Sequence, residues 1–471
     1  MTIQYNTTTS QSLLSTRVYF EPYCSQNDGG ILSHSRITAF VLRLFGLIVD
    51  VKDREGKNFY LNKISLIRWL KSHHADTSLP TYIDRINKVC ADLQQRNTCP
   101  TNTSGVGAPQ NTTATPQKAS SEVQNPFINW MKTGTSDWLS ATPSQNAIYE
   151  FKIDSLKKPS SSLLTGFSQT MIHDKLATQI VSSANVTKGQ VTQARKAVQE
   201  WLQNHPEYVG QRVSIRANNN LVDVIVVGKK ENLTNGRWTL FSNGTGEIGE
   251  WAFQNHIHRA KELNSNLVFF SYPGSSGSRG TMARNNLISS YLGVANFVKE
   301  VIEPMQMIYW GTSLGGGVQG YALKYYKPNP SSKHVFVKYQ TFTKISPVVE
   351  YHAQKQGGVA SWLASSVSID NLVKNAKWQL HSVKTSRSLQ HPEIIVQTAN
   401  TLHPQKAEDI LPDGCFEAQT SLATELLKDG PKPNKKFIGV QAMHCQALTR
   451  EETNELNHAV LKALEPSFAG F

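Results

Sequence analysis

Cysteine is scarce in this sequence, and the few cysteines are placed in a way that excludes several classes of protein. The five of them in 471 residues are Cys24, Cys90, Cys99, Cys415 and Cys445. Their odd number and wide spacing argue against a disulfide framework and favour thiols that stay reduced where the chain folds. Because no Cys-x-x-Cys pair and no Cys/His zinc spacing occurs, we expect no bound metal ion.

The chain also lacks an apolar run long enough to cross a membrane. A spanning helix needs about twenty apolar residues, whereas the most apolar stretch, residues 37–51, is shorter and contains Arg43. We expect this stretch to form a buried or interfacial helix, and an interfacial helix beside a basic surface would give peripheral membrane contact. Residues 1–10 are polar and uncharged. They show no signal-peptide pattern, so we expect a cytoplasmic protein.

The positive charge of the chain does not point to nucleic acid. Lys and Arg number 48 against 35 Asp and Glu, a formal net charge of +13. Such an excess can attract nucleic acid, an anionic membrane or acidic partners. The basic residues are spread thinly, however, with local concentrations only near 324–344, 374–387 and 428–436. No RNA-binding signature or long basic tail accompanies them, so we expect a solvated basic surface and no nucleic-acid partner.

Composition divides the chain into regions. Residues 1–94 carry helical patterns and predict an N-terminal helical region. Residues 95–122 are almost without apolar side chains and predict a flexible linker. Residues 123–209 predict a mostly helical segment ahead of the main domain. In residues 210–471 strands and helices alternate, which predicts an α/β domain with a mainly parallel sheet and helices on both faces. Within it, the helical patterns of 346–392 predict a cap insertion.

Individual elements of the main domain can be placed from periodicity and turn residues. The strands are expected at 211–217, 221–228, 237–242, 267–272, 305–310, 335–345, 394–398 and 437–440. The helices are expected at 187–204, at 250–263, from about 281 through 301, at 318–326 and at 451–464. Ligands of such a sheet bind at the carboxyl ends of its strands.

The most informative motif follows the expected strand at 305–310. Residues 311–315 read Gly-Thr-Ser-Leu-Gly, the G-x-S-x-G pattern of a nucleophile elbow, in which the serine lies on a strained turn between a strand and a helix. A Cβ at Gly311 or Gly315 would clash with neighbouring backbone in a turn so tight. The pattern alone is a weak signal. The strand before it and the helix after it supply the required context for Ser313 as nucleophile.

A serine nucleophile needs a base, and the base needs an acid to orient it. His444 comes shortly after the last expected strand, and we predict it as the base. Three acids follow the preceding strand: Glu408, Asp409 and Asp413. We predict Asp409, because an acid leading into an apolar pair and a proline is the usual form of this loop. Glu408 or Asp413 could take the role instead.

The oxyanion of the reaction needs two backbone N–H donors. We predict Leu314, directly after the nucleophile, and Thr245, in the Asn-Gly-Thr-Gly turn at 243–246. The rival interpretation of the glycine-rich turns is phosphate binding. It fails because no Lys-Ser/Thr pair follows Gly317 and because the glycines of segment 271–280 are spaced three apart.

These motifs resemble those of the α/β-hydrolase superfamily over about residues 210–465. The resemblance rests on the turn at 243–246, the elbow, and segment 271–280, which is similar to the superfamily's D-x-R-G-x-G-x-S loop with Ser271 in place of Asp. The Asn-Gly turn, the elbow and His444-Cys445 also resemble the CHLPS family of chlamydial proteins, which are hydrolase-like. That second resemblance implies a protein of an intracellular bacterial pathogen, which could be delivered to a host cell.

Together these features predict a serine hydrolase that cleaves a carboxylic ester or thioester through an acyl-enzyme, with no cofactor and no metal. The apolar residues of the expected cap suit an acyl or lipid substrate, and they are explained equally well by ordinary packing. The alternative is an inactive hydrolase-like protein whose sheet serves as a binding platform for a host or bacterial protein partner. Either protein could also associate with a membrane through residues 37–51.

Overall fold

The computed structural model describes residues 48–52 and 58–62, most of 125–156, and, apart from four single positions, residues 188–355 and 369–471. The chain divides into two compact units, Met1–Val123 and Gln124–Phe471. Each is described by itself. No helix among the described residues is long and apolar enough to span a membrane.

The first unit contains a two-stranded antiparallel sheet. Strand β1 (Ile48–Lys52) pairs with β2 (Asn58–Asn62), with Ile48 opposite Asn62. The helix predicted at 37–51 is therefore wrong over its last four residues. These residues read Ile-Val-Asp-Val, and β-branched side chains favour an extended backbone. The remainder of that predicted helix, the other N-terminal helices and the linker lie outside the described residues.

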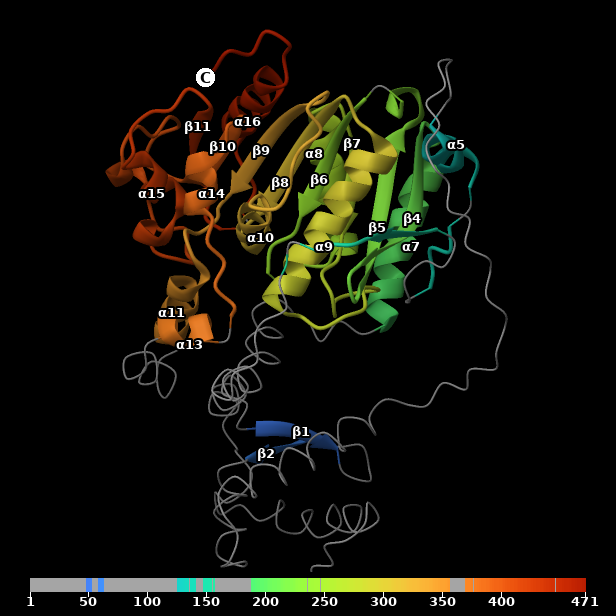
Figure 1. Cartoon of the computed structure of the whole chain (residues 1–471), viewed down its shortest axis with the longest axis horizontal. Coiled ribbons are helices and arrows are strands. Elements are labelled where there is room, and N and C mark those ends of the chain that lie inside the picture. Colours follow the sequence, from blue (N-terminus) through green and yellow to red (C-terminus); the bar gives the residue numbers. More distant parts are fainter. Residues whose placement is uncertain are drawn as a thin grey trace, which may run out of the picture. The chain divides into compact units, whose positions relative to one another are not determined.

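The second unit is built on a nine-stranded sheet with the order β11-β10-β9-β8-β6-β7-β5-β4-β3 (Figure 1). All neighbouring strands are parallel except that β5 is antiparallel to both β4 and β7. The mainly parallel sheet predicted from the sequence is confirmed. The strands are β3 (Ile148–Phe151), β4 (Tyr208–Ala217), β5 (Asn220–Lys229), β6 (Arg237–Ser242), β7 (Ser265–Phe270), β8 (Gln306–Thr312), β9 (Lys333–Tyr339), β10 (Glu393–Thr398) and β11 (Lys435–Val440).

Helices cover both faces of this sheet. One face packs against α7, α8 and α16. On the other face α9 contacts β4, α10 contacts β8 and α15 contacts β10. The helices are α5 (Pro126–Thr133), α7 (Lys188–Asn204), α8 (Gly249–Glu262), α9 (Arg284–Phe297), α10 (Leu314–Ala322), α11 (Ile345–Lys355), α13 (Ile369–Asn375), α14 (Val383–Ser388), α15 (Leu422–Leu427) and α16 (Arg450–Ala463).

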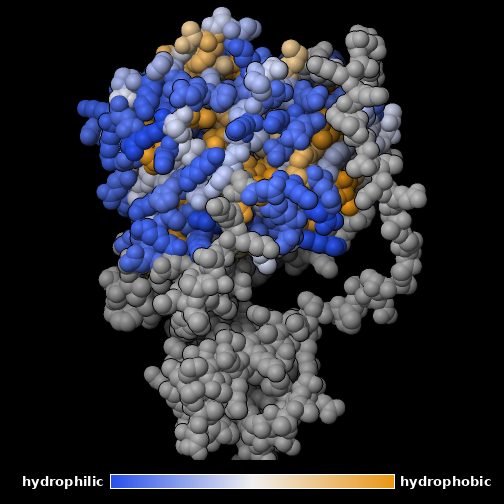
Figure 2. Space-filling view, viewed as in Figure 1, coloured by the Kyte–Doolittle hydropathy of each residue, from blue (hydrophilic) through white to orange (hydrophobic). Residues whose placement is uncertain are grey.

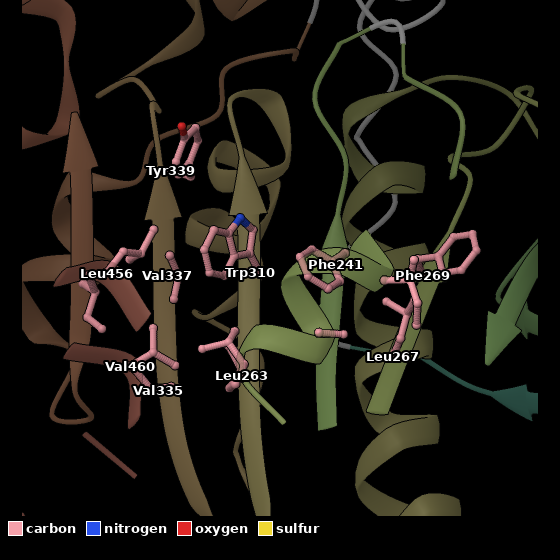
Figure 3. Close-up of a cluster of buried hydrophobic side chains, with 14 of the residues drawn as sticks. Phe241, Leu263, Leu267, Phe269, Trp310, Val335, Val337, Tyr339, Leu456 and Val460 are labelled. Carbon is pink, nitrogen blue, oxygen red and sulfur yellow. The ribbon is translucent and has the colours of Figure 1, made fainter. Parts of the chain in front are cut away.

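The core is formed by alternate side chains of the parallel strands. Figure 3 shows Trp310 of β8 between Phe241 of β6 and Val337 of β9, with Val460 of α16 over the same face. The rings of Phe241 and Trp310 lie 5.8 Å apart. Because successive side chains of a strand point to opposite faces, this alternation buries apolar residues on both sides. The exterior face drawn in Figure 2 is mostly hydrophilic where residues are described.

The segment predicted as helical ahead of the main domain contains more than helices. Strand β3 extends the sheet at its edge, parallel to β4, with Ile148 opposite Ser214. The side chain of Asn125 caps α5 and also donates to the carbonyl of Val301, 2.7 Å away, far along the chain. These contacts make residues from about 125 onwards part of the same folded unit as the sheet.

A buried cluster of two arginines and two acids joins this segment to the sheet. Arg195 of α7 pairs with Asp223 of β5, and its Nε lies 2.9 Å from Glu250 of α8. Arg212 of β4 lies 2.9 Å from the same Asp223 carboxylate oxygen. All four side chains are at most 3% exposed. A Cβ at Gly277, in the loop after β7, would lie 2.3 Å from Asp223, so this loop packs directly on the cluster.

The predicted cap region leaves the sheet between β9 and β10. Helix α11 begins shortly after β9 ends, and α13 is tied to it through Asp370, which accepts hydrogen bonds from Ser346 at 2.5 Å and Gln379 at 2.9 Å. Because α11 follows the end of a parallel strand, it begins at the carboxyl edge of the sheet.

Candidate active site

Ser313 lies on the tight turn between β8 and α10, with φ 50° and ψ −114°. A non-glycine residue adopts such a positive φ at a cost of roughly 1–3 kcal/mol, and the surrounding structure has to hold it there. Tyr339, the last residue of β9, and Thr341, two residues later, do so. The Ser313 N–H donates to the carbonyl of Tyr339 at 2.9 Å, and the Thr341 hydroxyl donates to the Ser313 carbonyl at 2.7 Å. The elbow is thus pinned to the end of the neighbouring strand.

Both glycines of the motif are sterically required, as predicted. A Cβ at Gly311 would lie 2.7 Å from the Cα of Gly316, and one at Gly315 would lie 1.9 Å from the carbonyl oxygen of Ser242. Such approaches are far shorter than real Cβ contacts. The helix therefore starts almost against the end of β6, and this proximity brings the turn at 243–246 beside the nucleophile.

Gly315→Ala is expected to destabilise the second unit by about 1–3 kcal/mol or more, because the Ser242 carbonyl belongs to a paired strand and cannot move aside freely. Urea unfolding measures the effect. The matched control is Gly244→Ala, whose Cβ would meet its nearest atom, the Cβ of Ser313, at 3.6 Å. That variant should keep or slightly raise stability. Equal unfolding midpoints for the two variants would contradict the close approach at Gly315.

His444 follows the end of β11 and forms a tight pair with Asp413. Its Nδ1 lies 2.7 Å from Oδ2 of Asp413, and its backbone N–H donates to the Asp413 carbonyl at 2.8 Å. A carboxylate only accepts, so we assign the ring proton to Nδ1, which leaves Nε2 as a proton acceptor. The Asp413 side chain is fully buried and that of His444 is 7% exposed.

The Asp413 carboxylate is itself held from three sides. Its Oδ1 accepts from the N–H groups of Cys415 at 2.9 Å and Phe416 at 3.1 Å, an Asx turn. Its Oδ2 also accepts from the side chain of Gln397 on β10 at 3.3 Å. The Phe416 ring stands edge-on to His444 at 5.6 Å. The acid and the imidazole are therefore fixed in position and orientation.

The structure corrects the choice of Asp409 as the partner of His444. The Asp409 carboxylate instead accepts from the N–H groups of Gln405 at 2.9 Å and Lys406 at 3.2 Å. These hydrogen bonds hold the pKa of Asp409 below its usual value, and the one from Gln405 has the largest effect. Glu408 is exposed. Of the three acids left open by the sequence, Asp413 is the one that the fold brings to His444.

Two polar residues position the histidine loop relative to the elbow. The carbonyl of Ala442 accepts from Gln340 Nε2 at 3.0 Å and from the Thr398 hydroxyl at 2.9 Å. Gln340 directly follows Tyr339, whose carbonyl holds Ser313, so one short segment contacts both loops. Sequence reasoning missed both residues. The signal was a buried polar residue directly at the end of an apolar strand.

The turn at 243–246 lies beside the nucleophile, as expected for an oxyanion-binding loop. Asn243 fixes it: Nδ2 donates to the Phe270 carbonyl at 3.1 Å and Oδ1 accepts from His256 at 2.8 Å. Burial lowers the pKa of His256 to about 3, so its ring is neutral and Nε2–H is the donor. Thr245 is exposed. Leu314 is the first residue of α10, where the N–H has no carbonyl partner within the helix. Their roles as donors stay predictions.

An acid that the sequence did not single out lies directly after this turn. Glu247 accepts from the N–H of Gly244 through Oε2 at 3.3 Å. Burial raises the pKa of this carboxyl, and the Gly244 hydrogen bond opposes the rise. A Cβ at Gly244 would lie 3.6 Å from the Cβ of Ser313 and 4.0 Å from Oε2 of Glu247, so this carboxyl lies close to the nucleophile.

The arrangement as a whole combines a strained serine, an oriented histidine and a buried acid. Ser313 and His444 both follow parallel strands, so they lie at the same edge of the sheet. Among the described residues, Asp413, Cys415 and His444 are also the group that could hold a metal ion.

A model of the family described as "Chlamydia CHLPS protein (DUF818)" matches residues 161–465. A comparison with curated proteins finds no match. Among solved structures, the chain is similar to the Pyrococcus furiosus esterase Pf2001, at 13% identity and a TM-score of 0.42, covering 56% of this chain and 95% of that one.

Two further solved structures are similar at the same low level. An alpha-beta hydrolase from Vibrio vulnificus shares 15% identity with a TM-score of 0.40, covering 63% of this chain and 91% of that one. A Pyrobaculum calidifontis esterase shares 13% identity with a TM-score of 0.40, covering 65% and 100%. The mainly parallel sheet and the strand–elbow–helix unit give the described second unit an α/β-hydrolase fold.

Proposed function

This chain belongs to the Chlamydia CHLPS protein (DUF818) family, and we propose that it is a serine hydrolase that cleaves a carboxylic ester or thioester. The observation that carries the proposal is the pairing of a strained elbow serine with a histidine whose Nδ1 lies 2.7 Å from a buried aspartate. Asp413 takes the place of Asp409 as the acid. No cofactor or metal is needed for this chemistry.

In the proposed acylation step, the Ser313 hydroxyl attacks the carbonyl carbon while Nε2 of His444 accepts its proton. The imidazolium that forms is stabilised by Asp413, which stays ionised. His444 then donates the proton to the leaving alcohol or thiol, and an acyl-enzyme remains. The Asp413 pair supports this sequence, because a ring proton held on Nδ1 by the carboxylate leaves the lone pair of the neutral imidazole on Nε2.

The proposed deacylation uses the same groups in reverse order. His444 takes a proton from water, whose oxygen attacks the acyl carbonyl carbon. The bond to Ser313 Oγ then breaks, His444 returns the proton to that oxygen, and the carboxylic acid leaves. In both steps the tetrahedral oxyanion would be held by the N–H groups of Leu314 and Thr245, each worth about 3 kcal/mol of transition-state stabilisation. The position of Leu314 at the start of α10 supports its part, since a helix N-terminus favours negative charge.

The cap region bears on the acyl group of the substrate. In the cap region, Val373 and Trp378 are 0% and 1% exposed and Ile369 is 8% exposed. Burial of these residues within the fold favours ordinary packing over a lipid-binding wall. A small acyl or lipid substrate remains the ligand class, and its chain length is best found by screening. Peripheral membrane contact and a host protein partner stay predictions.

A fluorophosphonate probe tests the proposal, with intact mass as readout. Wild type is expected to gain one adduct and Ser313→Ala none, because only an activated serine reacts at a useful rate. Thr312→Ala, one residue earlier, is the matched control and should label. No adduct on folded wild type, with a short-chain probe as well as a long one, would contradict the proposal and favour the binding-platform alternative.

A further inference from the structure

Cys415 lies two residues after the acid Asp413 in the sequence, and in space it lies close to both the acid and the base. One ligand atom from each of Asp413, Cys415 and His444 lies within 4.8 Å of the others. The side chains of Asp413 and His444 are 0% and 7% exposed, and Cys415 is half-buried, so the group meets solvent mainly at Cys415. The proposed hydrolase mechanism gives Cys415 no role.

The donor set selects a particular class of cation. A thiolate sulfur, an imidazole nitrogen and a carboxylate oxygen are the three ligand types that Zn²⁺ takes in proteins. Ca²⁺ and Mg²⁺ instead require several oxygen ligands and bind poorly to sulfur. Three protein ligands leave a fourth tetrahedral position for water. The group therefore fits Zn²⁺ and its thiophilic analogues Co²⁺ and Cd²⁺.

The backbone already holds two of these ligands together. The Cys415 N–H donates to Oδ1 of Asp413 at 2.9 Å, which fixes the cysteine relative to the carboxylate. Gln397 donates to Oδ2 at 3.3 Å. Hydrogen bonds of this kind to a ligating carboxylate orient it and strengthen metal binding. The Asp413 and Cys415 side chains therefore lose less conformational freedom when an ion binds.

We propose that Asp413, Cys415 and His444 form an inhibitory site for Zn²⁺ or a related thiophilic divalent cation. Binding releases the thiol proton of Cys415 to solvent. If the ion binds Nδ1 of His444, the proton of the neutral ring moves to Nε2, which then cannot accept the Ser313 proton. If it binds Nε2, the lone pair needed for that step is occupied. Either way the base is lost. This consequence rests on the proposed hydrolase function, whereas the binding itself does not.

Cobalt spectroscopy tests the binding without reference to activity. Wild type is expected to take up Co²⁺ with a thiolate-to-metal charge-transfer band. Cys415→Ser should lose that band and weaken Zn²⁺ binding by at least about tenfold, measured by competition with a chromogenic chelator. Cys90→Ser, the matched control for loss of a thiol, should keep both. Should Cys415→Ser fail to fold, His444→Gln serves instead and should weaken binding likewise.

A second arm separates failure of the site from failure of the proposed function. Wild-type labelling by the fluorophosphonate probe should stop in Zn²⁺ and return with EDTA, each protein being compared with its own metal-free rate. If the charge-transfer band appears but the metal-free protein does not react with the probe, the metal-binding site is supported and the hydrolase function is contradicted. Labelling without the band, or a band that survives in Cys415→Ser, would overturn the metal site and leave the hydrolase standing.

Discussion

Asp413→Asn is expected to lower kcat for a p-nitrophenyl ester by about 10⁴-fold while leaving the protein folded. Asparagine has nearly the same shape as aspartate, so its oxygen can still accept from the N–H groups of Cys415 and Phe416. Its NH₂ group, however, would face Nδ1 of His444 and force that nitrogen to act as an acceptor. The ring proton would then sit on Nε2, where Ser313 needs a base.

Asp409→Asn is the matched control for this prediction. Its carboxylate accepts only local backbone N–H groups in the described structure, and an asparagine oxygen can still accept one of them. We expect kcat within about twofold of wild type, because the Asp409 carboxylate contacts Gln405 and Lys406 and not His444. Glu408→Gln should behave likewise. A large loss in Asp409→Asn with near-normal activity in Asp413→Asn would restore the original assignment and contradict the geometry.

The elbow was predictable because short-range sterics determine it. A strand, a Gly-x-Ser-x-Gly turn and a helix are consecutive in the chain, and the clash distances at Gly311 and Gly315 involve backbone that must be near in any such turn. The mainly parallel character of the sheet follows from the alternation of strands and helices, whereas the order of the strands was not predicted. These parts of the fold follow from local pattern, and the structure has most of them within a few residues of the expected bounds. The strand expected at 335–345 is wrong over its last six residues, because β9 ends at Tyr339 and α11 begins at Ile345.

The acid was not predictable because its choice depends on the path of a loop. Asp413 lies fifteen residues beyond the end of β10 (413 − 398). Within that loop a bridge between Ala399 and Ile410 folds the chain back, and Gln397 then reaches the Asp413 side chain. No pattern in the sequence encodes that return. A residue such as Gln397, buried and polar in an apolar strand, marks where a partner must exist but not which one.

The segment before β4 was misjudged for a related reason. Strand β3 has only four residues, which is too short for periodicity to identify. The pairing of Arg195 with Asp223 and Glu250 joins residues 28 and 55 positions apart. Neither feature can be seen in a short stretch of sequence. A single arginine on the apolar face of a predicted helix does indicate, however, that buried acidic side chains pair with it in the fold.

Arg195→Met is expected to destabilise the second unit by about 3–5 kcal/mol, the cost of leaving a buried charge without its partner. Arg212 still compensates Asp223, whereas Glu250 keeps, among the described residues, the hydroxyls of Ser271 and Ser276 as its side-chain donors, at 3.2 and 2.6 Å. The urea unfolding midpoint of this unit should fall accordingly, with an unchanged slope.

The neighbouring Lys196 provides the matched control for Arg195. It lies on the same helix, its side chain is 65% exposed, and its surface pair with Glu200 spans 3.6 Å. Lys196→Met should change stability by no more than about 0.5 kcal/mol. Equal effects of the two substitutions would contradict a buried ionic cluster. Adding Glu250→Gln to Arg195→Met should recover part of the loss, because the two sites are directly coupled. Such recovery would identify the uncompensated charge, rather than lost packing, as the source of the destabilisation.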